Sequence, residues 1–258
     1  MRTRILLSIT LPLLAAAGCG GVNERQRTWL AEGERAYQDK QPALAVDRLS
    51  DFLGAVQDGP ESARARYVRG MALAQLGRRA AAYADLQRAV DGSADPEVTW
   101  RANAALGVLC FEDENWTAAG RALAAATSEM PAEPPADAFL YRLGLCYERT
   151  GRWGDAQTVY RQLVSRFPSG RYAAVASRRV ELRADHFAIQ CGVFSQAPSA
   201  DRLVAELRQQ GLEAYVRPEV RNGQACRVVC VGRYATYREA IAELARVRGY
   251  VSNAVLWP

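Results

Sequence analysis

A pattern of small residues recurs every 37 residues through the first two thirds of the chain. One glycine series, one alanine series and two series of mostly larger apolar residues keep this interval. They are Gly33, Gly70, Gly107 and Gly144; Ala45, Ala82, Ala119 and Ala156; Leu49, Leu86, Leu123 and Tyr160; and Phe52, Ala89, Ala126 and Leu163. Recurring small residues let paired helices approach closely, and larger ones fill the seam between units. The repeat therefore predicts an all-α superhelical stack of about four helix pairs.

The best copy of the repeat carries a recognisable motif. In "LYRLGLCYERTGRWGDAQTVYRQLVSRFP", Gly144, Tyr147, Gly151, Ala156 and Tyr160 lie at the spacing of a tetratricopeptide repeat, which this copy resembles. The resemblance covers residues 25–184, with "PSGRYAAVASRRVELRA" as a closing helix. It implies a concave groove that binds a protein partner, lined by aromatic residues. The residues expected there are Tyr37, Tyr67, Phe111 and Tyr141, although packing within a repeat would also explain them individually.

The periodicity changes at His186, where "FAIQCGVF" alternates as a strand. A helix, a strand ending at Asn222–Gly223, a return strand, a second helix and a short last strand follow. The predicted order is βαββαβ over residues 185–258. Two helices on one face of a four-stranded sheet would leave the other face open, so we expect a small α+β domain with a binding platform.

This second domain resembles the SPOR domain of bacterial envelope proteins. Gln190, Gly192 and Phe194 match the first strand of that family, and Gly232 and Tyr234 match the third. The resemblance implies binding to peptidoglycan glycan strands that have lost their stem peptides, the denuded strands that form chiefly at the division septum.

Strand alternation places Gln190 on the open face, opposite Ile189 and Cys191. The residues alone would also fit a solvated glutamine, but the resemblance favours a sugar ligand, since an amide both donates and accepts hydrogen bonds. The same alternation adds Tyr215 and Arg217, and Trp257 at the end of the last strand. Arg227 joins this glycan-binding set only if a bulge turns it onto the open face.

The cysteines and the single histidine indicate no catalytic or metal site. Apart from Cys19, the cysteines are Cys110, Cys146, Cys191, Cys226 and Cys230, none in a metal-binding spacing. Cys226 and Cys230 should face away from Cys191, so no disulfide is expected in the second domain. We predict that the chain is not an enzyme and uses no cofactor or metal. The net charge of +5 is too small and too scattered to indicate nucleic-acid binding.

The first 19 residues have the features of a secretory leader: Arg2 and Arg4, a short apolar run, then small residues. "AAGC" resembles the lipobox of bacterial lipoproteins, which implies lipidation of Cys19 and an outer-membrane location facing the periplasm in a cell with two membranes. An ordinary cleaved signal peptide is the alternative.

The combined prediction is a lipid-anchored envelope protein that binds denuded glycan through one domain and a protein through the other, in cell division or envelope organisation. The alternative is a scaffold for an outer-membrane or wall-enzyme complex in which glycan binding is secondary. A wall hydrolase is poorly supported, because repeats fill the region where a catalytic domain would lie.

Overall fold

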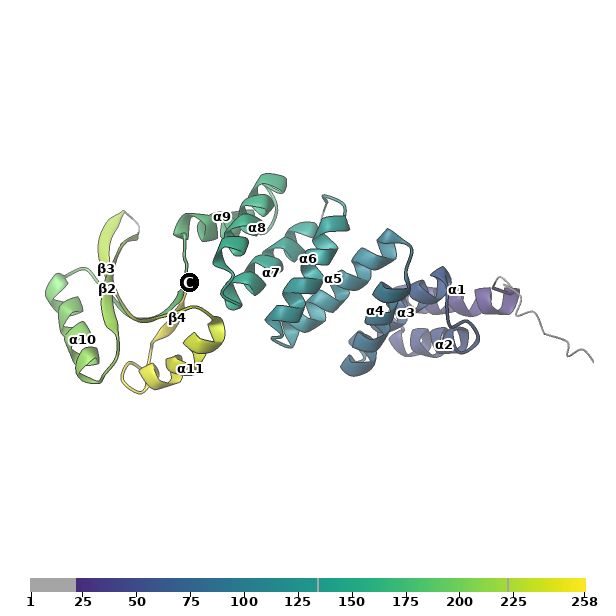
Figure 1. Cartoon of the computed structure of the whole chain (residues 1–258), viewed down its shortest axis with the longest axis horizontal. Coiled ribbons are helices and arrows are strands. Elements are labelled where there is room, and N and C mark those ends of the chain that lie inside the picture. The colour runs from purple at the N-terminus through teal and green to yellow at the C-terminus, as the bar shows by residue number, and fades with distance from the viewer. Residues whose placement is uncertain (1–21, 134, 222) are drawn as a thin grey trace, which may run out of the picture.

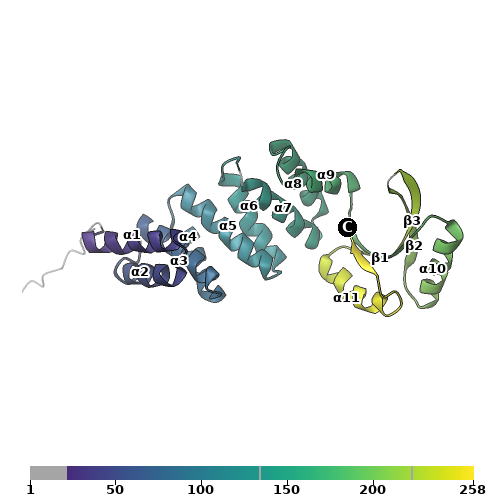
Figure 2. The same ribbon diagram turned by 180° about the vertical axis from the view of Figure 1, so that it is seen from behind.

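The computed structural model describes residues 22–133, 135–221 and 223–258. The described chain is elongated, with helix pairs stacked along its length and a small sheet domain at the C-terminal end (Figures 1 and 2). The predicted leader and Cys19 lie outside the described residues. Within the described residues, no helix is both long and apolar enough to cross a bilayer.

The repeat region consists of four antiparallel helix pairs and a closing helix, which confirms the all-α prediction. The pairs are α1 (Glu24–Gln38) with α2 (Pro42–Ala55), α3 (Pro60–Gln75) with α4 (Arg79–Gly92), α5 (Pro96–Glu112) with α6 (Trp116–Glu129), and α7 (Ala136–Arg149) with α8 (Trp153–Arg166); α9 (Ala173–Leu182) follows. Prolines stand in the first turn of α2, α3 and α5, where the missing N–H leaves no hydrogen bond unmade.

The 37-residue interval corresponds to one close contact that recurs in each pair. A Cβ atom placed on Gly33 would lie 2.5 Å from Leu49 Cγ, and one on Gly107 would lie 2.6 Å from Leu123 Cγ. Gly144 makes the equivalent contact with the ring of Tyr160. Real Cβ atoms do not approach other atoms so closely, so a glycine is required at this position of the first helix.

The closing helix α9 completes the stack through a buried ion pair. Arg179 Nη1 donates to Glu148 Oε2 on α7 at 2.9 Å, and the carbonyl of Arg179 accepts from Gln157 Nε2 on α8 at 3.0 Å. Glu148 is almost fully buried, and this burial raises the pKa of its carboxyl group despite the arginine. The contact joins α7, α8 and α9, so the closing helix covers the open side of the last pair.

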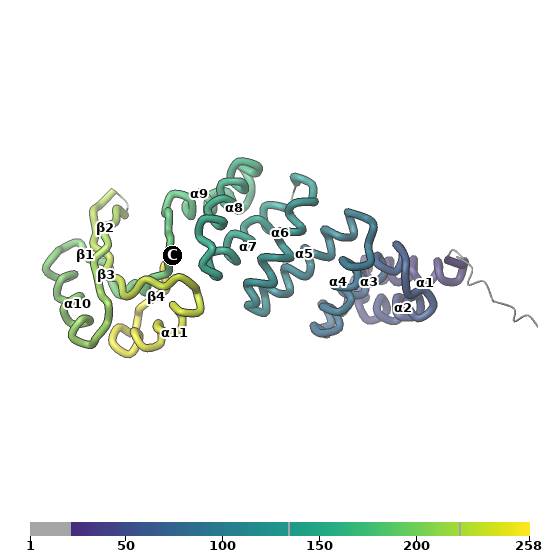
Figure 3. The backbone as a smooth tube through the Cα atoms, in the orientation of Figure 1, coloured from purple at the N-terminus to yellow at the C-terminus, as the bar shows by residue number. Residues whose placement is uncertain are grey.

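The C-terminal domain has the predicted βαββαβ order. Its elements are β1 (Phe187–Phe194), α10 (Ala197–Gln209), β2 (Ala214–Arg221), β3 (Gln224–Tyr234), α11 (Tyr237–Arg248) and β4 (Val255–Trp257). The strands form one antiparallel sheet in the order β2-β3-β1-β4. Both helices pack on one face of the sheet, and the sheet curves so that the other face is concave (Figures 1 and 3).

The two domains contact each other directly. Trp153 Nε1, at the start of α8, donates to the carbonyl of Ala235 at 3.0 Å, and its ring packs edge-on against Phe187. The Arg149 guanidinium carbon lies 3.9 Å from the ring centroid of Trp116 and 4.9 Å from that of Tyr237. The last two helix pairs therefore hold the sheet domain by aromatic and hydrogen-bonding contacts.

Candidate functional site

The concave face of the sheet brings together four of the five residues predicted to bind glycan. On the helix-covered face, Ile189, Cys191, Val229 and Val231 form the core with α10 and α11. The opposite positions of β1, β2 and β4 carry Gln190, Tyr215, Arg217 and Trp257. Strand parity therefore predicted the shared face correctly, while the binding role remains a prediction.

An aromatic and cationic cluster joins the two edge strands, β2 and β4, across this face. The guanidinium carbon of Arg217 lies 3.6 Å from the ring centroid of Trp257, a close cation–π contact. His186 Nε2 lies 3.3 Å from the Tyr215 hydroxyl, and the His186 and Trp257 ring centroids are 5.7 Å apart. Rings and hydrogen-bonding groups thus lie side by side, as a sugar-binding surface requires.

A carboxylate on the same face holds two arginines. Glu219 Oε2 accepts from Arg217 Nη2 at 3.1 Å, and Glu219 Oε1 accepts from Arg221 Nε at 2.8 Å. The hydrogen bond from Arg221, with the charges of both arginines, lowers the pKa of Glu219. Arg221 Nη2 also donates to Gln190 Oε1 at 3.1 Å. Gln190 is therefore connected to the charged cluster and is not isolated on the sheet.

Arg227 lies on the other side of the sheet, which corrects the conditional prediction that placed it in the site. The pairing of β2 with β3 is regular from Ala214↔Val231 to Arg221↔Gln224, so Arg227 keeps the parity of the core residue Val229. Its Nη1 donates to the carbonyl of Ser195 at 3.4 Å. The register shift near the middle of the sheet falls in β1, between Gln190 and Gly192, rather than in β3.

Sequence reasoning missed part of the concave face. Glu219 and Arg221 continue the alternation that starts at Tyr215 and Arg217, so the signal for them was present. Asp185 and His186 come directly before β1, where alternation gives no guidance, and Arg233, which pairs with Asp185, lies in β3 at a shift of the register with β1. These residues extend the site beyond the predicted set.

The cysteines lie on the expected faces of the sheet. Cys191 is in the helix-side core, whereas Cys226 and Cys230 pack on the concave side. The five cysteines of the described residues are free thiols, and burial raises the pKa of Cys191 to about 12. The described residues also contain no cluster of three or more His, Cys, Asp or Glu side chains suited to a metal ion.

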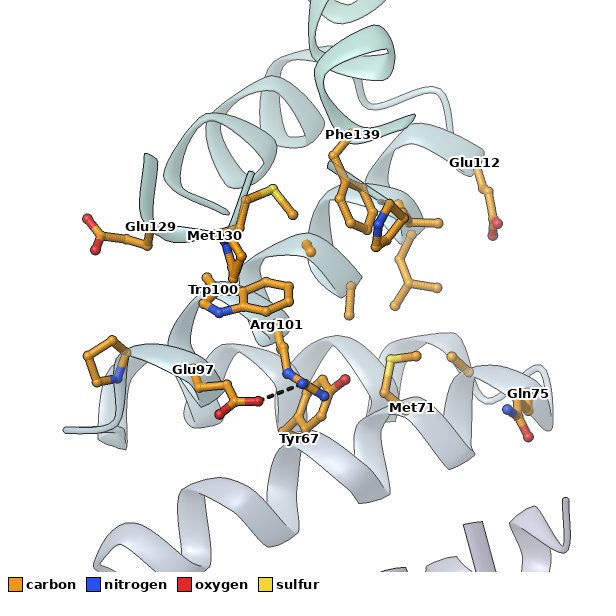
Figure 4. Close-up of a pocket in the computed structure, with 18 of the residues that line it drawn as sticks. Tyr67, Met71, Gln75, Glu97, Trp100, Arg101, Glu112, Glu129, Met130 and Phe139 are labelled. Carbon is orange, nitrogen blue, oxygen red and sulfur yellow. Dashed lines mark ion pairs between the residues drawn. The ribbon is translucent and has the colours of Figure 1, made fainter. Parts of the chain in front are cut away.

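A second candidate site is a groove along the repeats. A cavity of about 880 Å³ lies along α3, α5 and the start of α7 (Figure 4). Its apolar lining includes Tyr67, Met71, Trp100, Met130 and Phe139. An Arg101–Glu97 ion pair of 2.6 Å lies at its edge. The groove thus combines aromatic and methionine surfaces with a few charges, a composition that suits a peptide ligand.

The aromatic residues predicted for the groove divide into two groups. Tyr67 lines this cavity, and Tyr37 lines the adjoining one with it. Phe111 packs edge-on against Trp116 at 5.0 Å, and Tyr141 stacks on Tyr172 at 4.9 Å. Neither lines these two cavities, so their assignment to the groove stays a prediction.

Comparison with protein families agrees with both domains. The model described as "SPOR domain" matches residues 184–257, and two models described as "Tetratricopeptide repeat" match residues 138–170 and 63–92. The chain contains a SPOR domain and tetratricopeptide repeats. SPOR domains form a peptidoglycan-binding family associated with the cell envelope, and tetratricopeptide repeats mediate protein interaction.

Solved structures resemble the repeat region in fold. "MamA 41-end from Desulfovibrio magneticus RS-1" is 16% identical, with a TM-score of 0.51 over 64% of this chain and 92% of that one. "Crystal structure of MamA protein" is 20% identical, with a TM-score of 0.50 over 62% and 85%. No curated protein sequence matches the chain. At these identities the likeness concerns the fold alone.

Proposed function

We propose that the concave face of the SPOR domain binds denuded peptidoglycan glycan strands. The observation that carries this proposal is the gathering of Gln190, Tyr215, Arg217 and Trp257 on one curved face that no helix of the domain covers. Aromatic rings pack on the C–H faces of sugars, while the glutamine amide and the guanidinium groups bond to hydroxyl and N-acetyl oxygens. The face is a binding surface, and we propose no enzymatic activity for it.

The repeat groove is proposed to hold a protein partner. Tyr67, Trp100 and Phe139 offer large rings to one cavity, which is the arrangement that anchors apolar side chains of a peptide. The partner would be an envelope protein, since the SPOR domain belongs to that compartment. A scaffold role for the repeats is thus part of the proposal rather than its rival.

The leader and Cys19 complete the proposed function. A lipid on Cys19 would hold the N-terminal end at a membrane, and the SPOR domain at the far end of the chain would hold the wall. Simultaneous engagement of two sites raises the effective affinity of each, so the chain would act as a tether between membrane and wall, most useful where septal wall is remodelled.

The test is cosedimentation of residues 22–258 with wall sacculi, intact or pretreated with an amidase that removes the stem peptides. We expect strong binding to the treated sacculi and weak binding to the intact ones. A double variant, Tyr215→Ala with Trp257→Ala, should lose the binding. Tyr250→Ala is the matched control, because that exposed tyrosine lies next to α11, away from the concave face. Equal recovery on both kinds of sacculi, or by both variants, would refute the proposal.

A further inference from the structure

Two arginines of the concave face surround a carboxylate that belongs to the chain itself. Glu219 Oε2 accepts from Arg217 Nη2 at 3.1 Å and from Arg221 Nη2 at 3.4 Å, while Oε1 accepts from Arg221 Nε at 2.8 Å. All three side chains come from alternate positions of β2 and therefore lie on one face. The sheet thus already carries an arrangement of guanidinium groups that fits a carboxylate.

The arginine donors are only partly used. Arg217 Nη1 is shielded from water and has no hydrogen-bond acceptor among the residues that the structure describes. A guanidinium has five N–H groups in a planar fork, and a buried donor without an acceptor costs free energy. Stacking on Trp257 at 3.6 Å holds the Arg217 guanidinium in place without supplying that acceptor. Capacity for a further oxygen ligand therefore remains at Arg217.

The charge of the concave face is suited to an anion. Arg217, Arg221 and Arg233 contribute three positive charges, against two negative charges from Glu219 and Asp185. Arg221 and Arg233 are also substantially exposed, with 42% and 60% of their side-chain surface accessible. A ligand carboxylate would therefore meet reachable guanidinium groups on a face of net positive charge.

The proposed ligand acquires a carboxylate when it becomes denuded; this step rests on the proposed function. In intact wall, the lactyl group of each muramic acid is joined to its stem peptide by an uncharged amide. Hydrolysis of that amide leaves a free lactyl carboxylate on every second sugar. We propose that Arg217 and Arg221 form a carboxylate subsite that recognises the lactyl group of denuded strands, and that Glu219 holds the two arginines in position when no ligand is bound. Arginine forks suit this task because they bind carboxylates with two parallel hydrogen bonds.

The proposed subsite recognises the negative charge of the lactyl carboxylate. This can be distinguished by experiment from a site that only excludes the bulk of a stem peptide. If the domain only excluded the bulk of a stem peptide, a small neutral group in place of the carboxylate would bind equally well. If the arginines recognise the charge, the neutral group would bind poorly. Denuded strands whose lactyl carboxylates have been coupled to methylamine provide this comparison, because the modification removes the charge and adds few atoms.

The experiment measures binding of residues 22–258 to soluble denuded strands before and after methylamidation. We expect the modified strands to bind roughly tenfold more weakly or worse, since hydrogen bonds to charged groups are the stronger class. Equal affinity for the two ligands would overturn the subsite while leaving the proposed function intact. Failure to bind either ligand would overturn the proposed function and the subsite with it.

Variants then assign the effect to residues. Arg217→Gln and Arg221→Gln should each bind unmodified strands more weakly and show a smaller difference between the two ligands. Arg202→Gln is the matched control, because Arg202 is an exposed arginine on α10, on the helix side of the sheet. Its discrimination should equal that of the parent. If both concave-face variants discriminate as well as the parent, the subsite is assigned to the wrong residues and the inference fails.

Discussion

At the residue scale, Gln190 and its neighbours on β1 contribute side chains to two surfaces, the core beneath the helices and the concave face of the sheet. Ile189 and Cys191 are buried in the core beneath α10 and α11, while the Gln190 side chain accepts a hydrogen bond from Arg221 on the concave side. Because consecutive strand residues point to opposite faces, neighbouring substitutions should have opposite consequences.

Gln190→Ala should weaken glycan binding with little effect on folding. The change removes a hydrogen-bonding amide from a partly exposed position without opening a cavity. A hydrogen bond between uncharged groups contributes about 0.5–1.5 kcal/mol, so affinity for denuded strands should fall by about 2- to 12-fold. Binding isotherms and thermal melts of residues 22–258 measure the two effects together.

Ile189→Ala is the matched comparison and should act through stability. Ile189 is fully buried, and truncating such a side chain typically costs about 2–5 kcal/mol. The SPOR domain should therefore melt at a lower temperature or not fold. A Gln190→Ala protein that melts as early as Ile189→Ala, or that binds like the parent, would contradict the assignment of the two faces.

Strand alternation was enough to predict which side chains share the concave face, but not how they interact. Gln190, Tyr215, Arg217 and Trp257 follow from parity alone. The contact between Arg221 and Gln190 depends on how strongly the sheet curves, and curvature arises from twist and from the register shift after Gln190. Gly192 marks the region of the register shift, since a glycine within a strand often accompanies a bulge, but it does not specify how strongly the sheet curves.

At the element scale, the repeats depend on the match between a glycine on one helix and a large side chain on its partner. The four partner residues Leu49, Leu86, Leu123 and Tyr160 have no exposed surface. The alanine series lies beside this contact and is equally buried. Close helix packing of this kind leaves little room for additional atoms, so the alanine positions offer a sensitive test.

Ala119→Leu should destabilise the repeat region by about 1–3 kcal/mol, because three extra carbon atoms must be placed where the helices of the third pair touch. Ala119 on α6 has 0% exposed surface. Ala125→Leu is the control, since Ala125 is an exposed residue of the same helix. Urea denaturation of residues 22–258 should separate the two variants. Equal midpoints would mean that Ala119 is not at a helix contact.

The 37-residue pattern predicts which residues pack inside the repeats, but it does not predict which residues line the groove. The periodic series are the buried ones, because every unit must pack in the same way. The residues of the groove, among them Trp100 and Phe139, belong to no series, since each unit contributes a different side chain to a shared cavity. Phe111 and Tyr141 have suitable chemistry, and they pack against Trp116 and Tyr172 outside the two cavities described above.

At the scale of the whole molecule, the proposed function assigns a separate role to each end of the chain. A lipid on Cys19 at one end is proposed to reach a membrane, and the SPOR domain at the other to reach the wall. Cys19→Ala should move the full-length protein from the detergent-soluble membrane fraction to the aqueous envelope fraction, because each buried CH₂ of an acyl chain contributes about 0.8 kcal/mol to anchoring. A variant that stays membrane-bound with an unchanged mature N-terminus would exclude lipidation at this cysteine.

As a tether, the chain would hold membrane and wall at a fixed separation only if the repeat region and the SPOR domain keep a defined arrangement. The connection between α9 and β1 contains neither glycine nor proline, and Trp153 joins the repeats to the sheet domain. Trp153 belongs to a small cluster with Ala184, Phe187 and Ala240, separate from the core of the repeats. A substitution at Trp153 should therefore weaken the domain contact more than it weakens either domain.

Trp153→Ala should release the SPOR domain from the repeats. The change removes the hydrogen bond to the carbonyl of Ala235 and a nearly buried ring, and truncations of this kind cost about 3–5 kcal/mol. Small-angle scattering should then show a broader distribution of distances, and the thermal transitions of the two domains should separate. Trp153→Phe keeps an aromatic ring at the domain contact and loses part of the indole together with a hydrogen bond worth about 0.5–1.5 kcal/mol, so its scattering should stay closer to that of the parent than that of Trp153→Ala. Scattering from Trp153→Ala that matches the parent would mean that the short connection alone sets the domain arrangement.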